Sequence, residues 1–180
     1  MSDLLQIIKS RRTVRKFEDK PLQEETLNQI LEVTRWTQSW ANTQCWEIVV
    51  VQDPDLKEKL QQTLAKGNPA AKAMVQAPVV LALCAKLEVS GYYKGQVTTK
   101  HGDWFMFDLG LVTQDLCLAA HALGLGSVVV GLFDQDQGEK LLQVPAGHTL
   151  VCYIPMGYPA KIPEAPKKKE LNEFVHFETF

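Results

Sequence analysis

Apolar residues recur along this chain with two different spacings, and each spacing predicts one kind of element. Spacings of three and four residues predict a first helix that ends among cations, with the apolar residues Leu4, Leu5, Ile7 and Ile8. Pro21 is expected to open a second helix, whose apolar face comprises Leu22, Leu27, Ile30, Leu31 and Val33. A short third helix is expected after Asp53 and Pro54, through Leu56, Leu60 and Leu64.

Continuous apolar runs predict buried strands elsewhere in the chain. Such runs occupy residues 46–51, 77–83, 127–131 and 149–156. Asp134 is a suitable N-cap for a further short helix through Leu141 and Leu142. Helices and strands therefore alternate irregularly, which predicts an α+β fold, and 180 residues fit one domain spanning positions 1–180.

The segment from Trp104 to Leu123 is apolar around nearly its whole circumference. Only Asp108, Gln114, Asp115 and His121 interrupt it. A helix with one solvent-facing side would be polar on that side. We therefore expect either a central helix or a dimer seam, and the two aspartates near the middle argue against a membrane span.

Composition and charge narrow the classes of partner. The chain is 46% hydrophobic and 22% charged, a balance typical of soluble globular proteins. A net charge of -2 gives no overall attraction to nucleic acid or an anionic membrane. Any basic patch should therefore serve something local, such as a small anionic ligand.

The cysteines and histidines indicate no metal centre. Cys45, Cys84, Cys117 and Cys152 form no C-x-x-C pair, and three of them lie in apolar runs, where cysteine acts as a small hydrophobe. The four histidines show no metal-ligand spacing. The N-terminal residues lack the pattern of a signal peptide, from which we expect a cytoplasmic location.

A cluster of cations near the N-terminus could bind phosphate. Arg11, Arg12, Arg15 and Lys16 surround Thr13, and guanidinium groups with a hydroxyl match phosphate geometry. The alternative is a solvated helix end, and the lysines at 167–169 could equally belong to a solvated tail. The two clusters gain weight only if they converge. No Rossmann or Walker loop and no hydrolase triad is present in the sequence.

Several short motifs in order resemble the nitroreductase family of FMN-dependent oxidoreductases. The N-terminal ones are Ser10-Arg11-Arg12-Thr13-Val14-Arg15-Lys16-Phe17, Pro21 and Ser39-Trp40-Ala41-Asn42-Thr43-Gln44-Cys45-Trp46. Ala77-Pro78-Val79-Val80, Asp108-Leu109-Gly110, the 119–127 stretch, Gly131-Leu132-Phe133-Asp134, Met156-Gly157-Tyr158-Pro159 and the basic tail follow in family order. The resemblance covers nearly the whole chain.

The resemblance implies a fold and a set of cofactor contacts. The fold would be a central, mainly antiparallel sheet flanked by helices, in an intertwined homodimer with two FMN sites at the interface. Arg11, Arg12 and Thr13 would contact the phosphate or ribityl chain, and Lys168 would close on the phosphate. Arg15 would be the cation that polarises the flavin, with no residue acting as a nucleophile. Ser39, Asn42 and Gln44 would come from the partner's loop, and Gly131 and Leu132 would approach the ring.

The same resemblance implies reduction of a nitroaromatic, quinone or related acceptor by NAD(P)H through FMN, in a ping-pong sequence. Two alternatives stay open: an electron carrier reduced by a protein donor, and specialised family chemistry such as reductive dehalogenation or flavin fragmentation. Trp40 replaces a small family residue, so it would either narrow the cavity over the flavin or pack in the dimer core. Asn68, Lys72 and Trp104 are further candidates for the substrate pocket.

Overall fold

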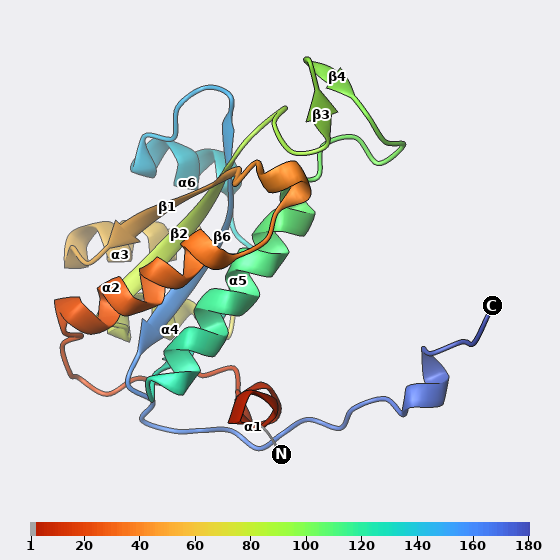
Figure 1. The fold of residues 1–180 in the computed structure, drawn as a ribbon. Coiled ribbons are helices and arrows are strands. Elements are labelled where there is room, and N and C mark those ends of the chain that lie inside the picture. Colours follow the sequence, from red (N-terminus) through yellow and green to blue (C-terminus); the bar gives the residue numbers. More distant parts are fainter. Residues whose placement is uncertain (1–2) are drawn as a thin grey trace.

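Four antiparallel strands form the centre of the computed structural model, which describes residues 3–180 (Figure 1). They are β1 (Trp46–Val51), β2 (Val79–Lys86), β5 (Gly126–Ser127) and β6 (His148–Gly157). The order across the sheet is β1-β2-β6-β5, and each neighbouring pair is antiparallel. The expected α+β fold with an antiparallel sheet is thus confirmed.

Helices cover both faces of the sheet, so its two central strands, β2 and β6, are buried on both sides. On one face, α2 (Glu24–Glu32) and α5 (Phe105–Ala122) pack against alternate residues of β2, including Leu81 and Leu83. On the other face, the side chains of Val80 and Ala82 pack with residues of α3, α4 and α6 and the segments beside them. These three helices are Pro54–Gln62, Ala71–Gln76 and Gln135–Leu142.

The long helix α5 has one face in the core and another that is uncovered in the single chain. Leu109, Val112 and Leu116 are buried against the sheet. Met106 and Phe107 remain 60% and 57% exposed. A central helix accounts for the first face only, so the dimer seam expected from the sequence remains a prediction for the second.

The N-terminal helix α1 (Asp3–Ser10) leads into a segment that lies along the edge of the sheet. Thr13 forms a parallel bridge with Ser127 of β5, and the Val14 N–H donates to the Ser127 carbonyl oxygen at 2.9 Å. Val14 is buried against Gly126, where a Cβ atom would lie 2.6 Å from the valine side chain. Gly126 is therefore needed for this close approach.

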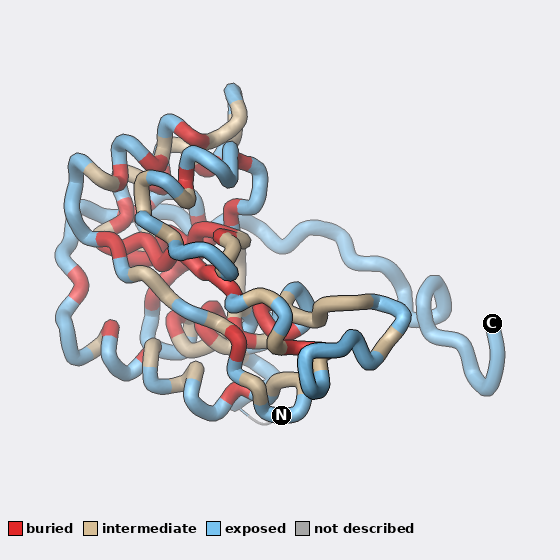
Figure 2. Tube along the Cα trace, turned by 90° about the horizontal axis from the view of Figure 1, so that it is seen from above, coloured by how far each residue is buried: buried red, intermediate tan, exposed pale blue. Residues whose placement is uncertain are grey.

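Two parts of the chain extend from the layered body. A hairpin of β3 (Tyr92–Tyr93) and β4 (Gln96–Val97) lies beside the start of α5 (Figure 1). Residues 160–180 form an exposed tail with a single short turn, η3 (Leu171–Glu173), and Figure 2 shows it leaving the body. Within residues 3–180, no helix combines the length and apolar character that crossing a membrane requires.

Most predicted elements are confirmed, but several of their boundaries were wrong. The second helix begins at Glu24 rather than Pro21, because Leu22 turns into the core from an extended segment. The strand expected over 127–131 is paired as β5 only at Gly126–Ser127, with a single further bridge at Val130. The third helix ends at Gln62. No pattern in the sequence predicted α4 or the hairpin.

Candidate functional site

The two basic clusters of the sequence converge on one cavity of about 600 Å³. Arg11, Arg12, Thr13 and Arg15 line it from the N-terminal segment, and Lys168 lines it from the tail. Lys9 adds a fifth cation, whereas Glu164 is the one carboxylate in the lining. The condition set by the sequence, that the clusters should meet, is fulfilled.

Pairing with β5 determines which side chains of the N-terminal segment reach this cavity. Val14 and Phe17 are buried, whereas Thr13 is half-buried and Arg15 is exposed. Arg12 is partly committed elsewhere, because its Nη1 donates to the carbonyl oxygens of Lys9 and Arg11 at 2.8 and 2.9 Å. That contact is the role expected of a cation at a helix C-terminus. Arg12 therefore bonds the end of α1 and also lines the cavity, and its contact with a phosphate stays a prediction.

The positive charge of the cluster perturbs its neighbours on α5. Burial, and then the charges of Arg11 and Arg12, lower the pKa of His121, whose Nε2 lies 2.8 Å from the Ser10 hydroxyl. Burial raises the pKa of Cys117, while a hydrogen bond with Ser127 and the charge of Arg11 act in the opposite direction. An anion in this region would therefore meet a positive local potential.

A second, smaller cavity of about 210 Å³ shares Arg11, Thr13 and Arg15 with the first. Its remaining lining comes from α5 and from the chain around β5: Thr113, Gln114, Cys117, Ser127 and Val129. Sequence reasoning missed Thr113 and Val129 as site residues. Gln114 interrupts an otherwise apolar helix in the sequence, and this polar position was the signal that could have identified it as a site residue.

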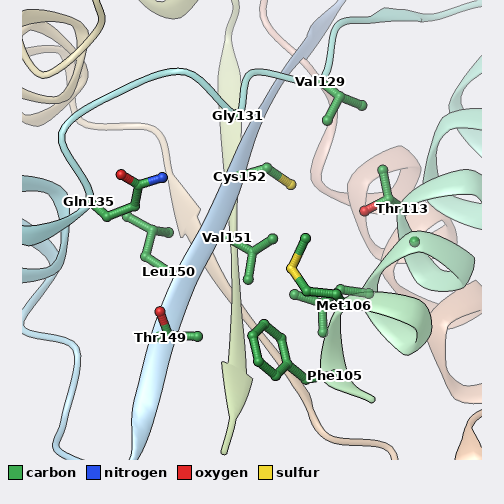
Figure 3. A pocket seen from close by; sticks show the side chains of 12 residues that line it. Phe105, Met106, Thr113, Val129, Gly131, Gln135, Thr149, Leu150, Val151 and Cys152 are labelled. Atoms are coloured by element: carbon green, nitrogen blue, oxygen red, sulfur yellow. The ribbon is translucent and has the colours of Figure 1, made fainter. Parts of the chain in front are cut away.

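An apolar groove of about 510 Å³ lies next to the smaller cavity, between α5 and β6 (Figure 3). Thr113 and Val129 line both spaces. The walls are mainly hydrophobic, from Phe105, Met106 and Leu109 on α5 and Leu150, Val151 and Cys152 on β6. Gln135 and Thr149 add polar groups at one side, as Figure 3 shows.

The predicted ring contacts, Gly131 and Leu132, lie along this groove and beside it. Gly131 lines the groove, and Leu132 is 67% exposed. The Asn68 side chain donates to the Leu132 carbonyl oxygen at 3.2 Å and accepts from the Ala70 N–H at 2.9 Å. Asn68 therefore supports the backbone of this loop.

The loop that carries Ser39, Trp40, Asn42 and Gln44 lies at the opposite end of α5 from the arginines (Figure 1). Trp40 N–H donates to Asp108 in the first turn of α5, whereas Ser10 contacts His121 in the last turn. The 13 residue steps from Asp108 to His121 span about 20 Å of helix axis. The structure therefore does not bring the loop and the arginines of one chain together.

The remaining substrate-pocket candidates are also separated from the arginine cavity. Lys72 is exposed on α4, the helix on the other face of the sheet, and lines none of the three cavities. Trp104 is half-buried at the start of α5, and its Nε1 donates to the Thr99 hydroxyl at 2.7 Å. Trp40 is half-buried in the turn η2 (Trp40–Asn42), which leaves both of its expected roles open.

The three adjoining spaces suit an elongated ligand with unlike ends. One end offers cations and the Thr13 hydroxyl, the middle offers Gln114 and Ser127, and the other end is an apolar groove. A phosphate with a polar chain and a flat aromatic body has the complementary character. The four cysteines are free and buried, so they act as packing groups, as expected from the sequence.

Comparisons with known proteins agree with this description. A family model described as "Nitroreductase family" matches residues 8–74 and 66–158. An NADH dehydrogenase from Thermus thermophilus is 30% identical over 178 residues, covering 84% of each chain. An FMN reductase (NAD(P)H) from Bacillus subtilis is 29% identical over 100% of this chain and 75% of its own. A protein from Desulfovibrio desulfuricans solved in complex with FMN is 25% identical with a TM-score of 0.81, covering 100% of this chain and 99% of its own.

Proposed function

The chain belongs to the nitroreductase family, and from that premise we propose that it is an FMN-dependent oxidoreductase acting as a homodimer. The observation that carries the proposal is the convergence of Arg11, Thr13, Arg15 and Lys168 on one cavity. That cavity shares three lining residues with a smaller cavity, which in turn shares Thr113 and Val129 with an apolar groove beside α5. Bound FMN supplies two-electron redox chemistry, which we assign to transfer from NAD(P)H to a nitroaromatic, quinone or related acceptor by a ping-pong sequence.

The residues present fit FMN as a ligand. The phosphate is dianionic near neutral pH, and Arg11, Thr13 and Lys168 provide charge-assisted and hydroxyl hydrogen bonds for it. Gln114 and Ser127 suit the hydroxyls of the ribityl chain. The apolar walls beyond Thr113 and Val129 suit the flat ring, with Gly131 allowing close approach of backbone.

Arg15 has a different role in this proposal. It lines both the phosphate cavity and the smaller cavity leading to the groove, so it lies between the two ends of the ligand. A fixed cation there stabilises the negative charge that appears when the flavin is reduced. The protein thus contributes binding, orientation and polarisation, and no side chain is required as a nucleophile.

A second chain completes the site. Ser39, Asn42 and Gln44 line none of the three spaces assigned to FMN in the single chain, and their loop lies at the far end of α5 from the arginines. Two antiparallel copies of α5 would bring the loop of each chain to the arginines of the other. The exposed Met106 and Phe107 side chains favour such a seam, because burying them stabilises the dimer.

Anaerobic mixing of the FMN-loaded protein with NADH or NADPH tests the enzymatic part of the proposal. We expect the visible absorbance of oxidised flavin to disappear within seconds, and to return when a quinone or nitroaromatic is added. An unchanged spectrum with both nucleotides would favour the electron carrier, which needs a protein donor. Rapid reduction without transfer to either acceptor class would point to the specialised chemistry.

A further inference from the structure

Asp108 is a fully buried carboxylate that joins two segments, residues 40–45 and the turn at Ser90, to the start of α5. It accepts hydrogen bonds from the Trp40 N–H at 2.9 Å and the Ser90 hydroxyl at 2.7 Å. The Thr43 hydroxyl and the Cys45 thiol approach the same carboxylate at 3.5 and 3.6 Å. Three of these four donors belong to the stretch from 40 to 45.

A carboxylate is a costly group to bury for packing alone. Removing it from water is unfavourable unless donors replace the lost solvation, and an apolar residue of similar size often gives equal or better stability. The four donors around Asp108 provide that replacement. A buried acceptor of this kind fixes the positions of its donors, which an apolar side chain would not do.

The stretch held by Asp108 has a strained backbone. Ala41, Asn42 and Gln44 have φ angles of 44°, 58° and 48°, in the left-handed region that disfavours residues other than glycine. Ala41 has no polar side chain to ease this conformation. Such strain persists only where the surroundings enforce it, and it is concentrated at functional sites. The Asp108 contacts lie on both sides of the strained positions, at Trp40 and Cys45.

This conformation presents a small polar surface to the outside. The Ser39 hydroxyl accepts from the Gln44 backbone N–H at 2.9 Å, and the Gln44 side-chain amide donates to Oδ1 of the Asn42 side chain at 3.1 Å. Asn42 and Gln44 are exposed, so their remaining hydrogen-bonding groups are available to a ligand. The polar surface is thus organised before any ligand arrives.

We propose that Asp108 is a positioning residue, which holds residues 39–45 in the strained form that contacts a flavin bound by the arginines of a second chain. The inference rests on the proposed function. Asp108 itself is buried beneath the loop and acts through Trp40, Thr43 and Cys45. Its effect therefore belongs to the partner's site and not to the site formed by its own arginines.

The variant Asp108→Asn tests the positioning role with minimal change of shape. The amide keeps one acceptor for the Trp40 N–H but replaces the other oxygen with a donor that faces the Ser90 hydroxyl and the Cys45 thiol. We expect FMN affinity to fall by at least about tenfold in a folded dimer. Ser90→Ala, which removes one donor only, should give a smaller loss and serves if Asp108→Asn does not fold.

A matched control comes from the same helix. Asp115 accepts from the Thr37 hydroxyl at 2.7 Å, outside the strained stretch. Asp115→Asn should lower the melting temperature and leave FMN affinity unchanged. Wild-type FMN affinity in both Asp108→Asn and Ser90→Ala would overturn the proposal.

Mixed dimers show which site Asp108 serves. Each proposed site combines the arginines of one chain with the loop of the other. In a dimer of one Arg11→Ala chain and one Asp108→Asn chain, both defects therefore affect the same site, and the second site is intact. Half of the FMN should then bind with wild-type affinity. A dimer of wild type with a chain carrying both substitutions should contain no intact site. The reverse pattern would show that Asp108 acts on its own chain's site and would overturn the proposal.

The same measurements separate this inference from the proposed function. An Arg11→Ala homodimer with wild-type FMN affinity, or a protein that is monomeric while saturated with FMN, would contradict the two-chain arginine site itself. Weakened binding in Arg11→Ala with unaffected binding in Asp108→Asn and Ser90→Ala would leave the site in place and remove only the positioning role.

Discussion

At the scale of single residues, Arg15 and Arg11 should have separable effects although they line the same two cavities. We assign Arg11 to the flavin phosphate, which is charged in both redox states. We assign Arg15 to the negative charge that the flavin ring carries only after reduction. Arg15→Ala should therefore lower the flavin's reduction potential more than it lowers FMN affinity. A loss of about 1.5–3 kcal/mol for a charge-assisted contact corresponds to about 30–60 mV for a two-electron couple.

Potentiometric titration of the FMN-loaded variant measures this shift. Arg35→Ala is the matched control, because Arg35 pairs at 2.7 Å with Glu32 on the exposed side of α2 and the turn after it. Surface pairs of this kind contribute little, so the control should keep the wild-type potential. A wild-type potential in Arg15→Ala would show that this guanidinium does not face the reacting part of the flavin.

The buried cysteines make stability sensitive to alkaline pH. Burial raises the pKa of Cys152 to about 12, and burial followed by the charge of Asp108 raises the pKa of Cys45 to about 12. Unfolded thiols lose their protons near the ordinary value of 9.0, whereas the folded ones keep theirs. Between about pH 9 and about pH 12 the unfolded state therefore binds fewer protons, and the free energy of unfolding falls as pH rises.

Melting temperatures from about pH 8 to about pH 11 measure this fall. Cys152→Ala should begin from a lower melting temperature, because a core group is removed, but should show a shallower alkaline decline. Tyrosines and lysines titrate in the same range, so the comparison between variant and wild type isolates the thiol. Identical alkaline slopes would mean that Cys152 titrates in the folded protein as it does in the unfolded chain.

The sequence indicated which residues could bind a phosphate, but it could not show that they line the same cavity. The sequence separated Arg11 from Lys168 by 157 positions, and only the fold shows that both line one cavity. Asp108 appeared in the sequence as an interruption of an apolar helix. Its donors at Trp40 and Cys45 lie 68 and 63 positions away, which is beyond any local pattern.

At the scale of elements, the arginines are positioned by the pairing of their segment with β5 at the edge of the sheet. Gly126 permits this pairing because it leaves room for the Val14 side chain. A Cβ atom at Gly126 would lie 2.6 Å from the Val14 side chain, which is buried. Gly126→Ala should push the 11–15 segment away from β5, at a cost of about 1–3 kcal/mol for overpacking. FMN affinity should fall with it, because Arg11 and Arg15 move with Val14.

The double variant Gly126→Ala with Val14→Ala tests this explanation. Removing the valine methyl groups makes room for the new Cβ, so the double variant should be more stable than the sum of the two single effects predicts. Denaturant unfolding and FMN titration on all three variants measure the coupling. Strictly additive losses would mean that Gly126 is required for some reason other than the approach of Val14.

Elements with strong local signals were predictable, and elements shaped by the cavities were not. The strand β1 and the helix α6 after Asp134 agree with the sequence, because continuous apolar residues and a capping aspartate suffice to specify them. The regular pairing of the strand expected over 127–131 ends at Ser127, although the Val128 and Val130 N–H groups still donate to carbonyl oxygens of β6 and Val129 lines the cavities. Three consecutive valines, at 128–130, cannot reveal that departure, since each of them favours a strand.

At the scale of the whole molecule, FMN binding and dimerisation should be thermodynamically linked. The arginine cavity and the loop at residues 39–45 lie at opposite ends of α5, about 20 Å of helix axis apart. If each FMN needs both, the ligand binds the dimer more tightly than the separated chains. Linkage then requires FMN to strengthen the dimer by the same factor by which dimerisation strengthens FMN binding.

The exposed apolar side chains indicate how large the dimer interface should be. Leu4 and Ile8 on α1 and Met106 and Phe107 on α5 are each about half exposed in the single chain, and Phe177 in the tail is 86% exposed. Covering α1, α5 and the tail together should bury more than about 2,000 Å², the range of obligate homodimers.

Sedimentation velocity over a dilution series, with and without FMN, measures the linkage. The dimer should persist to lower protein concentration when FMN is present, and FMN affinity should decline at concentrations where dissociation begins. Arg11→Ala provides the control, because FMN should shift its dimer equilibrium only at correspondingly higher ligand concentration. A monomer that binds FMN as tightly as the dimer would show that one chain forms the whole site, and the separation of loop and arginines along α5 would then have no functional meaning.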